Sequence, residues 1–384
     1  MENNSGKPKK KLAAKYIIRR ALALAVLAFV VVFSVSTAAR CHREREEAVE
    51  TAAVANPHDI VNPYVSYTYE QLLADSAELA ESYPGLIELS SAGSSVEGRD
   101  LVQLKLGKGE KIIVLTGVLH GCEGFNSGLL MYMIDRYAYG YELDLNYEDY
   151  SYRELLDGVS FIILPMVNPD GMNIAVNGPD AAADPDNIYS MDTCGTGYYA
   201  WKSNANGVDI NRNFPFNWSH YTIYQWPSLR YYEGPQPGSE PETQAIINLL
   251  ESTDFCMLAD FHTYGEIIYW TDNLSGDTRE EHRELAELLK ETSGYGDAGI
   301  EDVDQFGGYL SNYARGVFGV FAATIEVTPY WGYSAEDGFD EAGMKAFPLP
   351  LVMAEYALRE DAELEGETAD GGEAALEDES GTAV

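Results

Sequence analysis

Apolar residues along the chain follow two spacings, one typical of amphipathic helices and one typical of buried strands. Helical spacing covers residues 67–83, 239–253 and 282–293. Alternating or continuous apolar runs predict strands at residues 86–93, 99–107, 111–118, 159–167, 255–262, 266–270 and 320–327. Alternation of strands with helices predicts an α/β fold, in which helices cover both faces of a largely parallel or mixed sheet.

The N-terminal region has a different pattern. Seven Lys or Arg residues precede 19 uncharged, mostly apolar residues at 21–39. This length suits a transmembrane helix, and the basic cluster before it predicts that residues 1–20 are cytoplasmic and that the rest of the chain is exported. Small residues at 36–39 also suit a cleaved signal peptide, so both an anchor and a secreted form stay open.

Composition divides the remainder of the chain. Residues 40–63 are polar and alanine-rich and are expected to be a linker, and residues 64–358 are expected to form one catalytic domain. Residues 359–384 are expected to be a disordered acidic tail, because residues 360–384 hold ten acids and no base. The formal charge of −37 makes nucleic acid an unsuitable partner.

Two histidines stand where buried strands are expected to end. His120 follows the run at 111–118, and His262 ends the run at 255–262. Glu123 lies one turn after His120, so one short loop can supply two ligands while His262 supplies the third from another strand. Two His and one carboxylate form a common catalytic zinc site with an open coordination position. A buried His beside a helix-start Glu is the simpler alternative for the first pair.

Further motifs occur in a fixed order along the chain. They are N-P-D-G at 168–171, N-R-N at 211–213, S-E-P-E at 239–242, the later His262 and the late Glu326. With H-x-x-E at 120–123, the sequence over residues 64–357 resembles the zinc carboxypeptidases of the carboxypeptidase A and B type. It is most similar to a bacterial branch that includes γ-D-glutamyl-diaminopimelate peptidases.

The resemblance implies a fold, a cofactor and roles for matching residues. The fold would be a single α/β domain with a mixed, mostly parallel eight-stranded sheet flanked by helices, after one N-terminal transmembrane helix. One Zn²⁺ per chain would be bound by His120, Glu123 and His262, and Asp209 would orient His120. Glu326 would be the general base, and Asn211 and Arg212 would bind the substrate's terminal carboxylate.

The chain also departs from the family pattern. Cys122 stands where an arginine is common, and Lys202 is the best match for the arginine that polarises the scissile carbonyl. The usual closing tyrosine falls near Val303, so Tyr264, Tyr309 and Tyr313 are candidates to replace it. Leu310 is the expected floor of the specificity pocket.

The predicted function is therefore a zinc-dependent metallocarboxypeptidase acting on extracytoplasmic peptides with a free C-terminus. Its domain is expected to lie outside a cell membrane that the N-terminal helix crosses once, and a monomer is expected. Three alternatives stay open: a cell-wall γ-D-glutamyl-diaminopimelate peptidase, a zinc amide or ester hydrolase acting on a small molecule, and a surface binding protein that has lost turnover.

Overall fold

The computed structural model describes residues 59–191, 195, 197–218, 224–271, 277–297, 307–332 and 334–359. Ten strands are present in these residues: β1 Ile87–Ser94, β2 Asp100–Gly107, β3 Lys111–Gly117, β4 Asn146–Tyr147, β5 Tyr150–Ser151, β6 Val159–Leu164, β7 Phe255–His262, β8 Ile267–Tyr269, β9 Gly296–Asp297 and β10 Phe321–Glu326. The α-helices are α2 Tyr69–Ser82, α3 Phe125–Glu142, α4 Tyr152–Gly158, α5 Pro169–Asn177, α6 Pro185–Met191, α7 Pro241–Ser252, α8 Asp277–Ser293, α9 Leu310–Tyr313, α10 Ala335–Gly338 and α11 Met344–Ala346, and residues 349–359 are also helical.

One mixed sheet forms the centre of the fold, with the strand order β1-β2-β6-β3-β7-β10-β8-β9. The pairs β6–β3, β3–β7, β7–β10 and β8–β9 are parallel, and β1–β2, β2–β6 and β10–β8 are antiparallel. Seven strands have three or more residues, so the expected eight are reached only with β9, a two-residue edge strand. The β4–β5 pair forms a separate small sheet that the sequence pattern did not predict.

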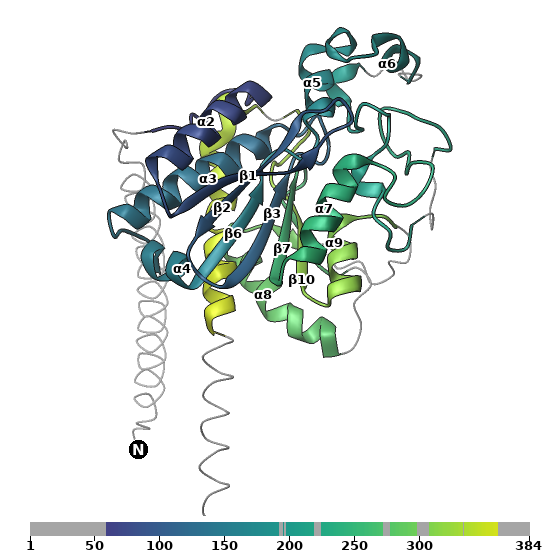
Figure 1. Ribbon diagram of the computed structural model, residues 1–384. Helices are drawn as coiled ribbons and strands as arrows, with labels where there is room; N and C mark the ends of the chain where they lie inside the picture. The colour runs from purple at the N-terminus through teal and green to yellow at the C-terminus, as the bar shows by residue number, and fades with distance from the viewer. Residues whose placement is uncertain are drawn as a thin grey trace, which may run out of the picture. The chain divides into compact units, whose positions relative to one another are not determined.

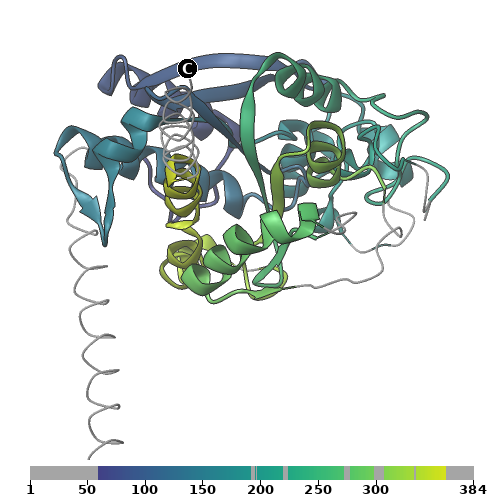
Figure 2. The same ribbon diagram turned by 90° about the horizontal axis from the view of Figure 1, so that it is seen from below.

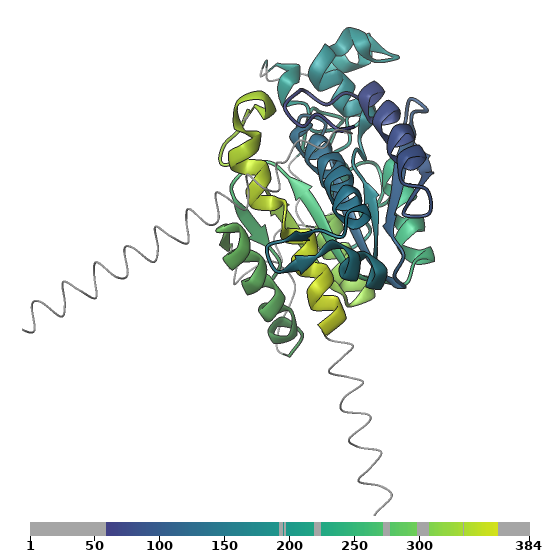
Figure 3. The same cartoon turned by 90° about the vertical axis from the view of Figure 1, so that its left-hand side faces the viewer.

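Helices cover both faces of this sheet (Figure 1). Helices α2, α3 and 349–359 lie on one side (Figure 3). The Tyr137 hydroxyl of α3 donates a hydrogen bond to the backbone carbonyl of Phe347, two residues before helix 349–359. Helices α7 and α9 lie on the other side, as the view from below shows (Figure 2). Their apolar side chains, including Ile246 and Tyr313, pack with Val114 of β3 in one core cluster.

Local sequence explains the main elements. Strand β6 is buried at every position, as expected for an apolar run covered on both faces. Helix α2 begins where the Thr68 side chain accepts a hydrogen bond from the Gln71 backbone N–H, which satisfies one of the free N–H groups of its first turn. Helix α7 begins at Pro241, whose missing N–H costs nothing at that position.

The parallel strands β3, β7 and β10 are neighbours and end at the same edge of the sheet. Glu326, the last residue of β10, is in register with His262, the last residue of β7. His120 lies three residues beyond the end of β3. The fold therefore brings together three side chains that are more than 60 residues apart in sequence.

Some predictions concern residues outside the described ranges. This group comprises the transmembrane helix at 21–39, the segment before it, most of the linker at 40–63, Val303 and the acidic tail beyond Arg359. Among the helices in the described ranges, none combines the length and apolar character needed to span a bilayer.

Candidate metal centre

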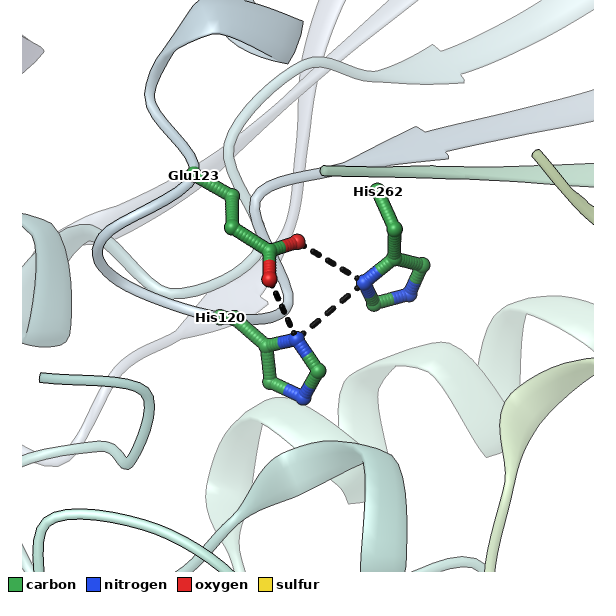
Figure 4. Close-up of side chains that lie close together, drawn as sticks. All are labelled: His120, Glu123 and His262. Carbon is green, nitrogen blue, oxygen red and sulfur yellow. Dashed lines mark hydrogen bonds and ion pairs between the residues drawn. The ribbon is translucent and has the colours of Figure 1, made fainter. Parts of the chain in front are cut away.

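His120, Glu123 and His262 meet at the end of the central strands (Figure 4). The Glu123 carboxylate lies 2.9 Å from Nδ1 of His120 through Oε1 and 2.9 Å from Nδ1 of His262 through Oε2. The two Nδ1 atoms are 3.2 Å apart. All three side chains are buried, and their ligand atoms lie within 4.8 Å of one another.

Each imidazole has a carboxylate behind its other nitrogen. Nε2 of His120 is 3.2 Å from Asp209, and Nε2 of His262 is 2.7 Å from Asp260. A carboxylate that accepts the Nε2–H proton leaves Nδ1 as a lone-pair donor and raises its basicity. Sequence reasoning identified Asp209 but missed Asp260. Because Asp260 lies two residues before His262 on the same strand, the two-residue period of a strand could have revealed it.

These residues fit a zinc ion. Two imidazole nitrogens and a carboxylate oxygen converge in a buried space, and this is the ligand set of many catalytic zinc sites. Burial opposes the ionisation of Glu123, but its interactions with the Lys202 ammonium and the two neighbouring imidazoles hold the pKa of Glu123 well below its usual range. An ionised Glu123 is the form that binds a metal.

Glu326 lies beside this set. Its Oε2 atom is buried and has no hydrogen-bond partner among the described residues. Burial raises the pKa of Glu326 to about 7, with His262 opposing the rise and Glu123 adding to it. The unpaired oxygen distinguishes Glu326 from Glu123, whose two carboxylate oxygens each lie 2.9 Å from a histidine nitrogen.

Lys202 lies at the edge of the centre. Its ammonium group donates to Oε1 of Glu123 at 2.8 Å and lies 5.9 Å from the centre of the Trp331 ring. Trp331, which sequence reasoning missed, contacts the ring of Tyr264 at 6.0 Å. The Tyr264 side chain is half exposed, so Tyr264 and Trp331 form an aromatic rim beside Lys202.

Asn211 and Arg212 follow Asp209 on a short 3-10 turn. The Arg212 guanidinium lies 4.1 Å from the centre of the Tyr309 ring and donates to the Asn211 carbonyl at 2.7 Å. Asn211 is only 2% exposed, and its amide nitrogen lies 3.2 Å from Nε2 of His262. Its amide oxygen accepts a hydrogen bond from the Leu310 backbone N–H at 2.9 Å. Arg212 therefore presents the more accessible of the two side chains.

Leu310 has no exposed surface and packs in the core cluster with Val114. As it stands, its side chain lines no open pocket, and its assignment to a pocket floor stays a prediction. Tyr313 packs in the same cluster, so it is not positioned to close over a substrate.

A pocket of about 350 Å³ lies next to the loop that carries His120 and Glu123. Its lining includes Gly121, Cys122 and Gly124 of that loop, together with Tyr67 and Met172. None of Asn211, Arg212 or Tyr309 lines it. Its lining mixes polar and apolar groups, and Glu336 is its one charged residue among the described residues.

Comparison with protein families decides the family. The model of the zinc carboxypeptidase family matches residues 72–334, more than half of the chain. The chain belongs to the zinc carboxypeptidase family. This confirms the resemblance drawn from the ordered motifs, and the His-Glu-His set fits the zinc site expected of this family.

Two relatives illustrate the range of this zinc carboxypeptidase family. The chain is 29% identical to γ-D-glutamyl-L-diamino acid endopeptidase 1 of Lysinibacillus sphaericus over 65% of this chain and 63% of that protein. It is 25% identical to carboxypeptidase B of Astacus astacus, over 76% of this chain and 96% of that protein. The matched region thus spans slightly less than two thirds of the bacterial relative.

A solved structure supports the fold. Bovine thrombin-activatable fibrinolysis inhibitor superposes with a TM-score of 0.62 over 78% of this chain and 99% of that chain, at 18% identity. The expected zinc carboxypeptidase fold, a mixed sheet flanked by helices, is therefore confirmed.

Removing the carboxylate behind His262 should weaken zinc binding without abolishing it. Asp260→Ala should lower zinc affinity about tenfold to a hundredfold, the usual effect of losing such a partner, whereas His262→Ala should abolish binding. Competition with a chromogenic chelator measures both. Asp75→Ala removes an equally buried acid on α2 that bonds Tyr67, and this control should keep wild-type zinc affinity. Undiminished zinc binding in His262→Ala would contradict the assignment.

Proposed function

We propose that the protein is a zinc metallocarboxypeptidase that releases the C-terminal residue of peptides. The observation that carries this proposal is the meeting of His120, Glu123 and His262 with Glu326 at the ends of neighbouring strands. Arg212 supports the exopeptidase part, because it lies three residues after Asp209, which contacts His120.

Zinc in this site would supply Lewis acidity, polarising the scissile carbonyl and making water a stronger acid. Residues of the chain would transfer the proton and stabilise the developing charge. Glu326 would take a proton from the attacking water and return it to the leaving amine. Lys202, beside the ligands, would stabilise negative charge that develops on the carbonyl oxygen.

Arg212 would fix the substrate by its end. A guanidinium fork can form two parallel hydrogen bonds with a terminal carboxylate, and Tyr309 supports its flat face. With the last residue near Arg212, the rest of the peptide would extend to the other side of the scissile bond. The pocket beside Cys122 is the space proposed for that part of the peptide.

A second candidate is hydrolysis of the γ-D-glutamyl bond to a diamino acid in cell-wall peptides. The 29% identity with the endopeptidase of Lysinibacillus sphaericus favours it. Such a substrate can also end in a free carboxylate, so Arg212 suits both candidates. A small-molecule amide or ester hydrolase is less well supported, because Arg212 is partly buried and its neighbour Asn211 lies 3.2 Å from His262.

The deciding experiment is a product analysis. The zinc-loaded protein is incubated with peptides that end in different free residues and with an L-Ala-γ-D-Glu-diamino acid peptide, and the products are identified by mass spectrometry. Release of single C-terminal residues from ordinary peptides supports the first candidate. Cleavage of the γ-D-glutamyl bond alone would support the second, and no hydrolysis of any peptide would overturn both.

For location, we propose a domain held outside the membrane by residues 21–39, on the strength of the seven basic residues before them. Protease added to intact cells should digest the domain, and the mature chain should still begin near Met1. A mature N-terminus at residues 38–40 would establish a cleaved signal peptide instead.

A further inference from the structure

Residues 202–213 carry four of the predicted site residues: Lys202, Asp209, Asn211 and Arg212. We call residues 202–213 the site segment. It has no strand and only the three-residue turn Ile210–Arg212. Backbone hydrogen bonds join it to neighbouring residues, from the Lys202 N–H to the Leu229 carbonyl at 2.9 Å and from the Asp209 N–H to the Tyr232 carbonyl at 2.8 Å. Side-chain hydrogen bonds add to these and link the segment to the S-E-P-E motif.

The start of the site segment is held by Asn204, which is fully buried. Its amide oxygen accepts the backbone N–H groups of Asn206 and Val208, at 3.0 and 3.1 Å. Its amide NH₂ group donates to Glu240 at 2.7 Å and to Glu242 at 3.1 Å. All the hydrogen-bonding capacity of Asn204 is thus used to join the turn of the segment to two acids of the S-E-P-E motif.

The end of the site segment is held by the same motif. The Asn213 amide oxygen accepts the Glu240 backbone N–H at 3.2 Å, and its NH₂ group donates to the Ser239 hydroxyl at 3.1 Å. The Asn206 amide also donates to Glu240, at 2.8 Å. Glu240 is 3% exposed and bonds the segment at both ends, through its side chain and through its backbone.

We propose that Glu240 is a positioning residue, which fixes both ends of the site segment and so holds Asp209 against His120 and Arg212 beside the metal centre. The part that concerns Arg212 rests on the proposed function, whereas the part that concerns Asp209 and His120 does not. Zinc affinity tests the part that concerns Asp209 and His120, and needs no substrate. The preference for a peptide acid over its amide tests the part that concerns Arg212.

Hydrogen-bond geometry separates this role from a simple need for charge. Glu240 receives amide donors from Asn204 and Asn206 on Oε2 and the Ser239 hydroxyl on Oε1. Glutamine can keep all three bonds, because the Ser239 hydroxyl can turn from donor to acceptor. Glu242 differs, since it receives the Val96 backbone N–H on one oxygen and the Asn204 amide on the other. Glutamine at position 242 would place its NH₂ group opposite one of these N–H donors, so one of the two hydrogen bonds would be lost.

The experiment compares Glu240→Gln, Glu240→Ala and Glu242→Gln. Glu240→Gln should keep zinc affinity and acid preference within about twofold of wild type. Glu240→Ala should lower zinc affinity about tenfold, by loosening the bond from Asp209 to His120, and should reduce the acid preference several-fold. Glu242→Gln should resemble Glu240→Ala in both measurements. Unchanged zinc affinity and acid preference in Glu240→Ala would overturn the proposal, and so would a Glu240→Gln as impaired as Glu240→Ala.

Two further variants keep the test decisive. Asp75→Ala also removes a buried acid, so it should lower the unfolding temperature while zinc affinity and acid preference stay at wild-type values. Asn206→Ala removes one bond to Glu240 from an exposed residue, and a small loss of zinc affinity, about twofold, is expected even if Glu240→Ala does not fold. No loss in Asn206→Ala together with a misfolded Glu240→Ala would overturn the role. If the wild type shows no acid preference, the proposed function fails, and zinc affinity alone decides on Glu240.

Discussion

Replacing Glu326 by glutamine should leave zinc bound and lower turnover by a hundredfold to ten-thousandfold, the range typical for loss of a general base. The amide has the shape of the carboxylate but cannot accept a proton from water. Glu326 contacts none of the ligands through a hydrogen bond among the described contacts, so the His-Glu-His set should keep its arrangement. Single-turnover rates measure the loss, and chelator competition measures zinc.

Glu266 provides the matched control for Glu326. It lies in the short connection between β7 and β8, and its carboxylate accepts a hydrogen bond from the Lys345 ammonium at 2.7 Å. Glu266→Gln should therefore keep near wild-type turnover. If Glu326→Gln were nearly as active as wild type and Glu266→Gln were not, Glu266 would be the base.

Amidation of the substrate's C-terminus should lower kcat/KM by about thirtyfold to several-thousandfold. A peptide acid can pair with Arg212 in two bonds, and its amide cannot. Breaking such a partly desolvated pair costs on the order of 2–5 kcal/mol, which corresponds to that range. The test compares an acid and its amide as substrates of wild type and of Arg212→Ala, in which the difference should largely disappear.

Conservative variants separate the fork from its charge. Arg212→Lys should retain little of the preference for the acid over the amide, because a point charge cannot form the two parallel hydrogen bonds. Tyr309→Phe should act like wild type, since the ring that lies 4.1 Å from the guanidinium remains, and Tyr309→Ala should lose part of the acid preference. Equal rates for acid and amide in the wild type would overturn the carboxypeptidase proposal, even with zinc and Glu326 established.

The sequence predicted the parts of the site that short motifs and strand ends define. His120, Glu123 and His262 meet because each follows or ends an apolar run, and adjacent parallel strands bring such ends together. The long strands and the helices α2, α7 and α8 were predicted for a similar reason, because each has an apolar period that repeats over several residues or turns. The edge strand β9 has two residues and leaves no such period.

The sequence could not predict side-chain placement that depends on distant segments. Asn211 bonds the backbone of Leu310, 99 positions later, and this contact turns the amide inward. The Trp331 ring lies 5.9 Å from the Lys202 ammonium although the two residues are 129 positions apart, and no motif links them. Such contacts depend on how loops pack after the sheet has formed, which a local pattern does not encode.

The central position of β3, β7 and β10 also bears on how the site responds to thermal fluctuation. Proteins open locally from their edges, and the backbone amides of central buried strands exchange with solvent only in the rarest, most global openings. Strands β8 and β9, at the sheet's edge, can open without separating β3 from β7. Amides of β3 and β7 should thus exchange orders of magnitude more slowly than those of β8, and His262, as the last residue of β7, should keep its place through most of the motions that the rest of the domain undergoes.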